Sequence, residues 1–418
     1  MLKPASRLAL LALLLTACGG GPSGGGGTTP DPTPNPNPNP TPGPAPTPGP
    51  TPDPAPGTCA QQLSGVTNVT VATTLKNGPA ACDYLIDGVL NVTSVLTVEP
   101  GTVIRFGQDS EVQVGPGGVL NSVGTANARI RMEGLNKTKG YWEGISFGGG
   151  ARESRIEYTD IESAGQTGYY KNYAGVSGID GTLTFRNNTV SGSYANGMII
   201  PEDDRLTIKS FANNRFFDNV GYGLRVSATQ TGVLDAASDY LGGSQPNGLP
   251  YVKIDWDDVY GNTTWKKINA PYFVSIALYY KGGLLTVEPG VKVVMDDGAT
   301  LNIHGGAIRA VGTPQDPIVF TGVTQQKGAW DGIDFFYSRS DRNVMRYVRV
   351  LYGGGNGANV YVGNGSSLSI SDSHLAGSSG WGVCLDSIDV LDARATVDIG
   401  PGMTYEGNAA GNVNLECE

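Results

Sequence analysis

The sequence predicts an all-β chain that folds as a right-handed parallel β-helix, a solenoid of short strands, duplicated in tandem. The first observation is a repeat: Leu-Thr-Val-Glu-Pro-Gly occurs at residues 96–101 and again at 285–290. The second is that flanking residues continue the match, because Tyr-Trp-Glu-Gly-Ile-Ser-Phe at 141–147 answers Ala-Trp-Asp-Gly-Ile-Asp-Phe at 329–335. Such self-similarity is typical of stacked repeats, in which each unit buries its apolar face on its neighbour.

The strands of each copy are expected to be short, with one buried face. When the two copies are aligned, apolar residues occupy every second position in both and the residues between them differ, which is the period-two pattern of strands. Turn sequences such as Gly-Pro-Gly-Gly and Asp-Asp-Gly separate the strands. The residues expected to point inward are Ile104, Phe106, Val112, Val114, Val293, Met295, Leu301 and Ile303.

A shorter period indicates the size of one coil. Asn-Asn at 187–188 recurs at 213–214, and a glycine follows each pair, at Gly197 and Gly223. A repeat of roughly 20 to 26 residues suits one coil of about three short strands, with asparagines that bond one another from coil to coil at a bend. A β-propeller or a β-sandwich is the main competing fold, but each predicts longer strands and Asn-Gly hairpins.

The N-terminal part is expected to be an export signal and a spacer. Lys3 and Arg7 precede an apolar run shorter than the roughly 20 residues that cross a bilayer, so residues 1–17 are predicted to be a signal peptide. Leu-Thr-Ala-Cys at 15–18 resembles the bacterial lipobox, which implies a lipid on Cys18; an ordinary secretory signal is the alternative.

The folded part is expected to begin after a linker. Residues 18–57 are rich in Gly, Pro and Thr and contain no large apolar residue, so they are predicted to be a disordered spacer. The two halves of the β-helix are placed at 58–250 and 251–418, continuous with one another.

Four further cysteines indicate disulfides in an exported chain. Three pairings are open, and the sequence positions favour Cys59 with Cys82 and Cys384 with Cys417, because one pair then lies at each end of the folded part. Metal binding is disfavoured, since neither pair has Cys-x-x-Cys spacing or a histidine nearby.

The charge balance limits the partners. The formal net charge is −10 and no basic cluster is present, which argues against nucleic acid and against an acidic polysaccharide held on a broad basic face.

The repeats resemble those of bacterial surface lipoproteins with right-handed parallel β-helices, in the pectate-lyase-like superfamily. The resemblance covers nearly all of residues 65–415 and implies a fold and a place on the cell surface. It implies no single activity, since the superfamily includes lyases, hydrolases and adhesins. The residues that carry it are Leu96 to Phe106, Gly117, Gly124, Thr125, Trp142 to Ile145 and Tyr158, with their echo from Leu285 to Tyr347.

The catalytic motifs of the enzymes in that superfamily are missing. The chain has no Gly-His-Gly, no Arg-Ile-Lys and no Arg-x-Pro-x-x-Arg. The weak catalytic candidates are Glu143 and Asp331, because both copies place an acid after a tryptophan; a structural corner would show the same pattern. No cofactor and no metal are expected, although acidic pairs are ligands that Ca²⁺ accepts.

Aromatic residues in polar segments are the remaining candidates for a site. Flat rings beside amide and acid side chains hold sugar faces, but rings that seal the junction between the copies would look the same. The candidates for sugar contact are Tyr169, Tyr170, Tyr173, Trp256, Trp265, Tyr279 and Tyr280.

These observations favour a lipid-anchored β-helix protein of the bacterial envelope, facing outward from the outer membrane or cell surface. Its expected role is structural, adhesive or carbohydrate-binding, with the membrane, an envelope polysaccharide or a surface protein as partner. The alternative is a polysaccharide lyase or a glycoside hydrolase. An enzyme predicts a groove along one strand face lined by clustered charged residues, whereas a scaffold predicts scattered charges.

Overall fold

The computed structural model describes residues 59–166, 174–201, 206–255, 258–386 and 394–417. Within these ranges the chain is a parallel β-solenoid of about 13 turns, with one short 3-10 helix, η1 (Ala228–Val233). The predicted fold class is confirmed.

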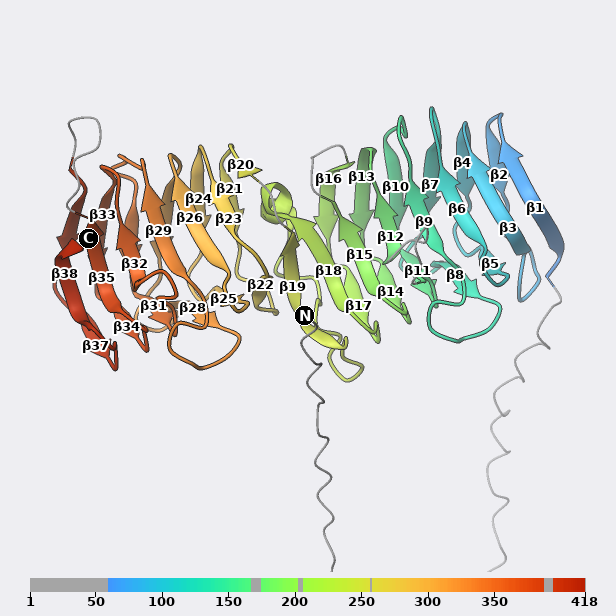
Figure 1. Cartoon of the computed structure of the whole chain (residues 1–418). Coiled ribbons are helices and arrows are strands. Elements are labelled where there is room, and N and C mark those ends of the chain that lie inside the picture. Colours follow the sequence, from blue (N-terminus) through green and yellow to red (C-terminus); the bar gives the residue numbers. More distant parts are fainter. Residues whose placement is uncertain (1–58, 167–173, 202–205, 256–257, 387–393, 418) are drawn as a thin grey trace, which may run out of the picture. The chain divides into compact units, whose positions relative to one another are not determined.

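The strands of successive coils stack in three rows, and most coils contribute one strand to each row (Figure 1). Two long N-terminal strands, β1 (Gln61–Val69) and β3 (Tyr84–Val92), run through rows 1 and 2 and pair with each other in parallel. In the second copy, β19 (Leu249–Asp255) begins the stack. The other strands fall into the same three rows in both copies.

Row 1 of the first copy contains β5 (Val103–Phe106), β8 (Ile130–Gly134), β11 (Thr159–Glu162), β14 (Thr189–Ser191) and β17 (Arg215–Phe217). Row 1 of the second copy contains β22 (Tyr272–Val274), β25 (Lys292–Met295), β28 (Ile318–Gly322), β31 (Val348–Leu351), β34 (His374–Ala376) and β37 (Thr404–Glu406).

Row 2 of the first copy contains β6 (Glu111–Val114), β9 (Gly144–Phe147), β12 (Ala174–Gly178), β15 (Asn196–Ile200) and β18 (Tyr222–Ser227). Row 2 of the second copy contains β20 (Asp258–Val259), β23 (Leu278–Tyr280), β26 (Thr300–His304), β29 (Gly332–Phe336), β32 (Ala358–Val362), β35 (Trp381–Asp386) and β38 (Gly411–Cys417).

Row 3 of the first copy contains β2 (Thr73–Leu75), β4 (Val95–Val98), β7 (Val119–Val123), β10 (Ser154–Glu157), β13 (Gly181–Arg186) and β16 (Leu206–Ala212). Row 3 of the second copy contains β21 (Thr263–Trp265), β24 (Leu284–Val287), β27 (Ala307–Val311), β30 (Val344–Arg346), β33 (Ser367–Ser371) and β36 (Thr396–Ile399).

The apolar side chains of all three rows fill one continuous interior. The buried cluster begins at Val69 and extends to Ala395. All eight residues that the alignment placed inward are buried, among them Phe106, Val114 and Val293, each with 0% exposure. The period-two pattern therefore located the core, because each short strand turns one face inward.

The asparagine ladder expected at the bend is present. Asn188 donates its side-chain amide to the carbonyl of Ile156 (2.8 Å), and its Oδ1 accepts from the backbone N–H of Thr159 (3.0 Å). The side chain of Asn214 makes the same two bonds one coil further on, to Phe185 (2.9 Å) and to the N–H of Asn188 (3.1 Å). Buried amides thus satisfy backbone groups that the turn leaves without ladder partners.

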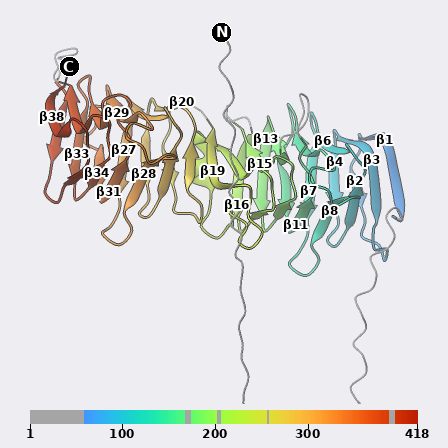
Figure 2. The same cartoon turned by 60° about the horizontal axis from the view of Figure 1, so that its bottom comes forward.

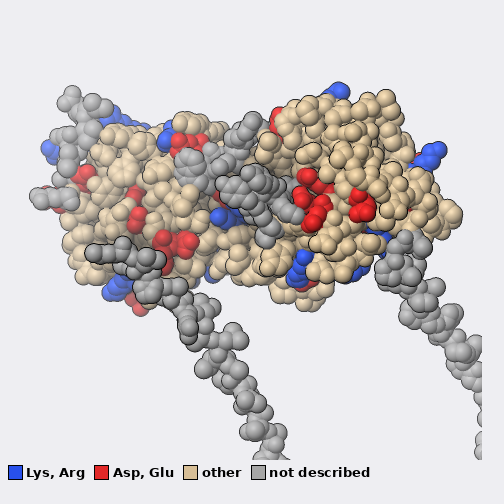
Figure 3. Space-filling view, turned by 45° about the vertical axis from the view of Figure 1, so that its right-hand side comes forward, with Lys and Arg blue, Asp and Glu red and all other residues tan. Residues whose placement is uncertain are grey.

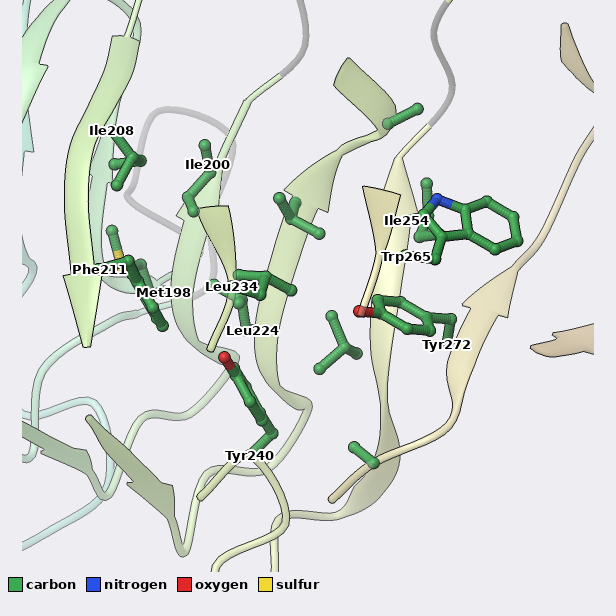
Figure 4. Packing of buried hydrophobic residues seen from close by; sticks show 14 of the residues in the cluster. Met198, Ile200, Ile208, Phe211, Leu224, Leu234, Tyr240, Ile254, Trp265 and Tyr272 are labelled. Atoms are coloured by element: carbon green, nitrogen blue, oxygen red, sulfur yellow. The ribbon is translucent and has the colours of Figure 1, made fainter. Parts of the chain in front are cut away.

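At the junction of the copies, η1 takes the place of a strand in row 3. The side chain of Gln230 donates to the carbonyl of Leu206 (2.7 Å) and accepts from the N–H of Ile208 (2.9 Å), as a neighbouring strand would. β19 continues the stack, since it pairs with β18 of row 2 on one side and with β22 of row 1 on the other. Aromatic rings, including Trp265 and Tyr272, fill the interior here (Figure 4).

Both predicted disulfides are present. Cys59 is bonded to Cys82 at the first coil, and Cys384 is bonded to Cys417 at the last. In the described part of the chain, no helix has the length and apolar character needed to cross a bilayer.

Candidate ligand-binding groove

A groove of about 370 Å³ lies along row 1 of the first copy, on the outer side of β8, β11, β14 and β17. These strands follow one another along the lower side of Figure 1, and Figure 2 turns that side toward the viewer. The residues that line this first groove are Arg131, Glu133, Lys137, Asp160, Glu162, Thr189, Ser191, Arg215 and Phe217.

Strand alternation explains why polar side chains meet here. Met132, Ile161, Val190 and Phe216 are buried, so the residues on either side of each point outward. Because parallel strands of successive coils lie about 4.8 Å apart, outward residues at matching positions become neighbours although they are far apart in sequence.

Ion pairs connect the charged residues of the first groove. Glu133 is bonded to Arg105 (3.1 Å) and Lys137 (3.3 Å), and Lys137 also reaches Glu162 (2.7 Å). Asp160 accepts a hydrogen bond from Arg129 (2.7 Å). Among the nine lining residues three are basic and three are acidic, so the groove is electrically balanced.

Glu133 is held in its ionised form. Burial raises the pKa of this carboxyl, but the hydrogen bond from Arg105 and the charges of Lys137 and Arg131 outweigh burial, and the pKa lies below its ordinary value. A carboxylate with a lowered pKa accepts hydrogen bonds but is a poor proton donor near neutral pH.

Phe217 supplies an aromatic surface at one end of the groove. The guanidinium of Arg215 lies over its ring, 4.2 Å from the centroid, and also pairs with Asp239 at 3.5 Å. A flat ring beside charged hydrogen-bonding groups is a combination that sugar rings can use, because they present both C–H faces and hydroxyls.

The two weak catalytic candidates lie at a repeated corner. The indoles of Trp142 and Trp330 are fully buried and donate to the carbonyls of Glu162 and Leu351, both at 2.9 Å. The corner needs a glycine after each acid, since Gly144 has φ 110° and Gly332 has φ 125°. The Trp and Gly of the motif are thus structural. A catalytic role for Glu143 or Asp331 remains a prediction.

Asp334 lies on β29, two residues after Gly332 of this corner, and no signal in the sequence singled it out. It is only 2% exposed, and burial raises its pKa to about 6, although Asn356 and Thr300 donate hydrogen bonds to Oδ2. The first copy carries Ser146 at this position, and Ser146 donates to Glu111 (2.6 Å). In the first copy the acid, Glu111, lies on β6 and the hydroxyl, Ser146, on β9. In the second copy the hydroxyl, Thr300, lies on β26 and the acid, Asp334, on β29.

The structure corrects the interpretation of two aromatic candidates. Trp265 and Tyr280 have 0% exposure and belong to the interior, where Trp265 stacks on Tyr272 with ring centroids 5.8 Å apart. Their segments looked like loops because they are polar, but they are short strands whose outward residues carry the polarity. Tyr279 is outward and half-buried, with Lys281 over its ring at 5.6 Å.

The remaining candidates lie outside the described residues: Tyr169, Tyr170, Tyr173, Trp256, Cys18, and the segments 1–17 and 18–57.

On the face seen in Figure 3, Lys and Arg side chains are scattered and Asp and Glu gather in small groups. The fold defines the chain as a parallel β-solenoid protein. Comparison of the chain with protein-family models, with curated proteins and with solved structures found no match.

Proposed function

We propose that the chain is a surface protein of the bacterial envelope that binds an uncharged polysaccharide in the first groove. The observation that carries this proposal is the groove itself, which follows row 1 across four strands and combines balanced charges with the ring of Phe217. A groove along the stack suits an extended polymer, because successive coils offer similar outward positions to successive sugars.

The charge balance supports an uncharged ligand. Glu133, Asp160 and Glu162 already have cationic partners, and so has Lys137. An additional charge on the ligand would be repelled by one member of each pair, whereas a hydroxyl can donate to a carboxylate and accept from a guanidinium.

The pKa values of the acidic side chains favour binding over catalysis. A glycosidase needs one carboxyl with a raised pKa in contact with the ligand, and the pKa of Glu133 is lowered. Burial raises the pKa of both Asp331 and Asp334, but these residues lie just before and within β29 of row 2 and do not line the first groove. A lyase or hydrolase remains the alternative activity.

The proposed location rests on the sequence. The lipobox-like residues before Cys18 support a lipid anchor, and the proline-rich segment supports a spacer between the membrane and the solenoid. The resemblance of the repeats to surface lipoproteins of the pectate-lyase-like superfamily supports the same place.

Calorimetric titration of the purified full chain with uncharged polysaccharides from envelopes and plant walls tests the proposal. Phe217→Ala should weaken binding by up to about tenfold, because an aromatic contact contributes on the order of 1 kcal/mol beyond its buried area. Tyr260→Ala is the matched control, because Tyr260 is 66% exposed and lies outside the groove. Binding that is indifferent to Phe217 would contradict the proposal, and release of reducing ends or unsaturated sugars would establish the enzymatic alternative.

A further inference from the structure

The second copy has a groove at the equivalent place. This second groove, of about 430 Å³, lies on the outer side of β31, β34 and β37 and beside the segment that follows β28. β31, β34 and β37 correspond to β11, β14 and β17 of the first groove, and the segment after β28 corresponds to the segment after β8. Its lining residues are Gln325, Lys327, Arg349, Leu351, Tyr352, His374, Ala376, Gly377, Glu406 and Gly407.

One lysine occupies the same position in both copies, but among the residues that the structure describes it has a charged partner in only one. Lys139 donates to the carboxylate of Asp218 (2.7 Å) and to its carbonyl (2.6 Å). Lys327 is the equivalent lysine, and Gly407 stands where Asp218 would be. Both copies therefore carry the cation, and only the first carries a carboxylate opposite it.

A second cation replaces an acid. Asp160, which pairs with Arg129 in the first copy, corresponds to Arg349, and Glu162 corresponds to Leu351. Within the described ranges, neither Arg349 nor Lys327 takes part in an ion pair. The lining contains two cations, Lys327 and Arg349, and a single acid, Glu406. The groove therefore carries an excess of positive charge, although the net charge of the chain is −10.

We infer that the second groove binds an anionic group of a glycan, a carboxylate or a sulfate ester, held by Arg349 and Lys327. The inference rests on the proposed function, since it takes a carbohydrate as the ligand. The planar guanidinium of Arg349 can donate two parallel hydrogen bonds to either group, and an ammonium adds a point charge. Leu351 and Tyr352 provide apolar surface beside the two cations. The two grooves thus differ in the charge of the ligand that they select.

The site is local, and the negative net charge of the whole chain limits the ligand. At a salt concentration of about 0.15 M, fields from exposed charges fall off over about 8 Å, so a short anionic oligosaccharide can reach the cations without strong repulsion from the rest of the chain. Long polyanions should bind less well than short ones.

Calorimetry on the full chain with three short oligosaccharides tests the inference: a glucuronate oligomer, a sulfated glucan oligomer and the uncharged glucan. The wild-type chain should bind at least one anionic probe more tightly than the uncharged one at this groove. Arg349→Ala and Lys327→Ala should each weaken that binding by about tenfold, as expected for loss of a charge-assisted hydrogen bond. The two anionic probes separate carboxylate from sulfate recognition.

Gly407→Asp is the more specific test, because it adds a carboxylate without removing any side chain of the groove. It restores the carboxylate that faces the lysine in the first copy, so it should lower the affinity for the anionic probe by a similar factor. The backbone accepts the change, because Gly407 has φ 63°, Asp218 has φ 56° and a Cβ at residue 407 meets nothing within 4 Å. Arg309→Ala is the control, because Arg309 is an exposed cation on β27 in row 3.

Anionic and uncharged probes that bind equally, or anionic binding that survives all three groove variants, would overturn the inference. If binding of the uncharged probe still depends on Phe217 in that case, the proposed function stands alone. If no probe binds, both fail.

Discussion

The indole ring of Trp142 lies flat on the phenyl ring of Phe106, with ring centroids 3.8 Å apart and planes 4° apart. Phe106 comes from row 1 and Trp142 from the segment that enters row 2, so the stack closes the corner between two faces of the solenoid. The same indole donates to the carbonyl of Glu162 in the next coil.

Trp142→Ala should therefore lower the free energy of unfolding by about 3–5 kcal/mol, the usual cost of emptying a large aromatic site, and it also leaves a carbonyl without its donor. Urea unfolding followed by fluorescence or circular dichroism measures the change. Tyr260→Ala, at an exposed position, should stay within about 0.5 kcal/mol of the wild type. A Trp142 variant as stable as this control would show that the corner carries no packing energy.

Asn188→Ala should cost about 1–3 kcal/mol, because the carbonyl of Ile156 and the N–H of Thr159 would be buried without partners. Asn213→Gly is the neighbouring comparison, since it removes only an exposed hydrogen bond to Asn187 (3.2 Å) and the φ of 55° at residue 213 suits glycine. Equal stability of the two variants in thermal or urea unfolding would contradict the ladder as a stabilising element.

Asp334 should make stability fall as the pH rises. Its pKa is about 6 in the fold against an ordinary value of 3.8, so the folded state binds the proton more tightly, and stabilisation present below pH 4 is lost as the pH rises toward 6. Linkage puts the change on the order of 3 kcal/mol. Asp334→Asn should flatten this part of the pH profile and raise stability at pH 7. An unchanged profile in urea titrations between pH 4 and 7 would place the proton elsewhere.

Removing the C-terminal disulfide should loosen the last coil. In the chain-entropy model, Cys384→Ser together with Cys417→Ser should lower stability by roughly 3 kcal/mol. Amide hydrogen exchange should rise first in β35 and β38, which the bond joins. Exchange that rises equally along the whole solenoid would mean that the disulfide supports global rather than local stability.

Cys18→Ala should move the chain from the membrane fraction to the soluble or secreted fraction, because the proposed lipid would have no attachment point. Detergent-free fractionation of expressing cells measures the distribution. If the variant stays with the membrane, the anchor proposal is wrong, whatever the grooves bind.

The core was predictable from sequence, whereas the grooves were not. The inward residues, such as Ile104 and Val293, could be recognised because apolar and polar residues alternate within strands of four residues, and this alternation is a local property of the sequence. Arg131 and Arg215 are outward residues of β8 and β17, and nothing local distinguishes them from any other exposed arginine. Only the stacking of coils brings them into one groove.

For the same reason, the sequence left sugar contact and interior packing open for Trp265 and Tyr280, and the structure decides for packing. Each has polar neighbours in the sequence, which suggested an exposed loop, but in a strand those neighbours point away from the ring that they flank. A strand of only three residues is too short for its alternation to be recognised with confidence in sequence alone, and the packing against Tyr272 decides its direction.

The sequence by itself determined that this chain repeats and that its strands are short and one-sided, because alternation and spacing are local properties of the chain. It favoured, but did not fix, cysteine pairs that close the two ends. Only the tertiary structure decided which charges meet, since ion-pair partners in a solenoid lie in neighbouring coils, tens of residues apart in sequence. Lys139 pairs with Asp218, whereas Lys327 has no ion-pair partner within the described part of the chain. Small differences between the copies at these outward positions, such as Gly407, change the chemistry of the surface without disturbing the fold.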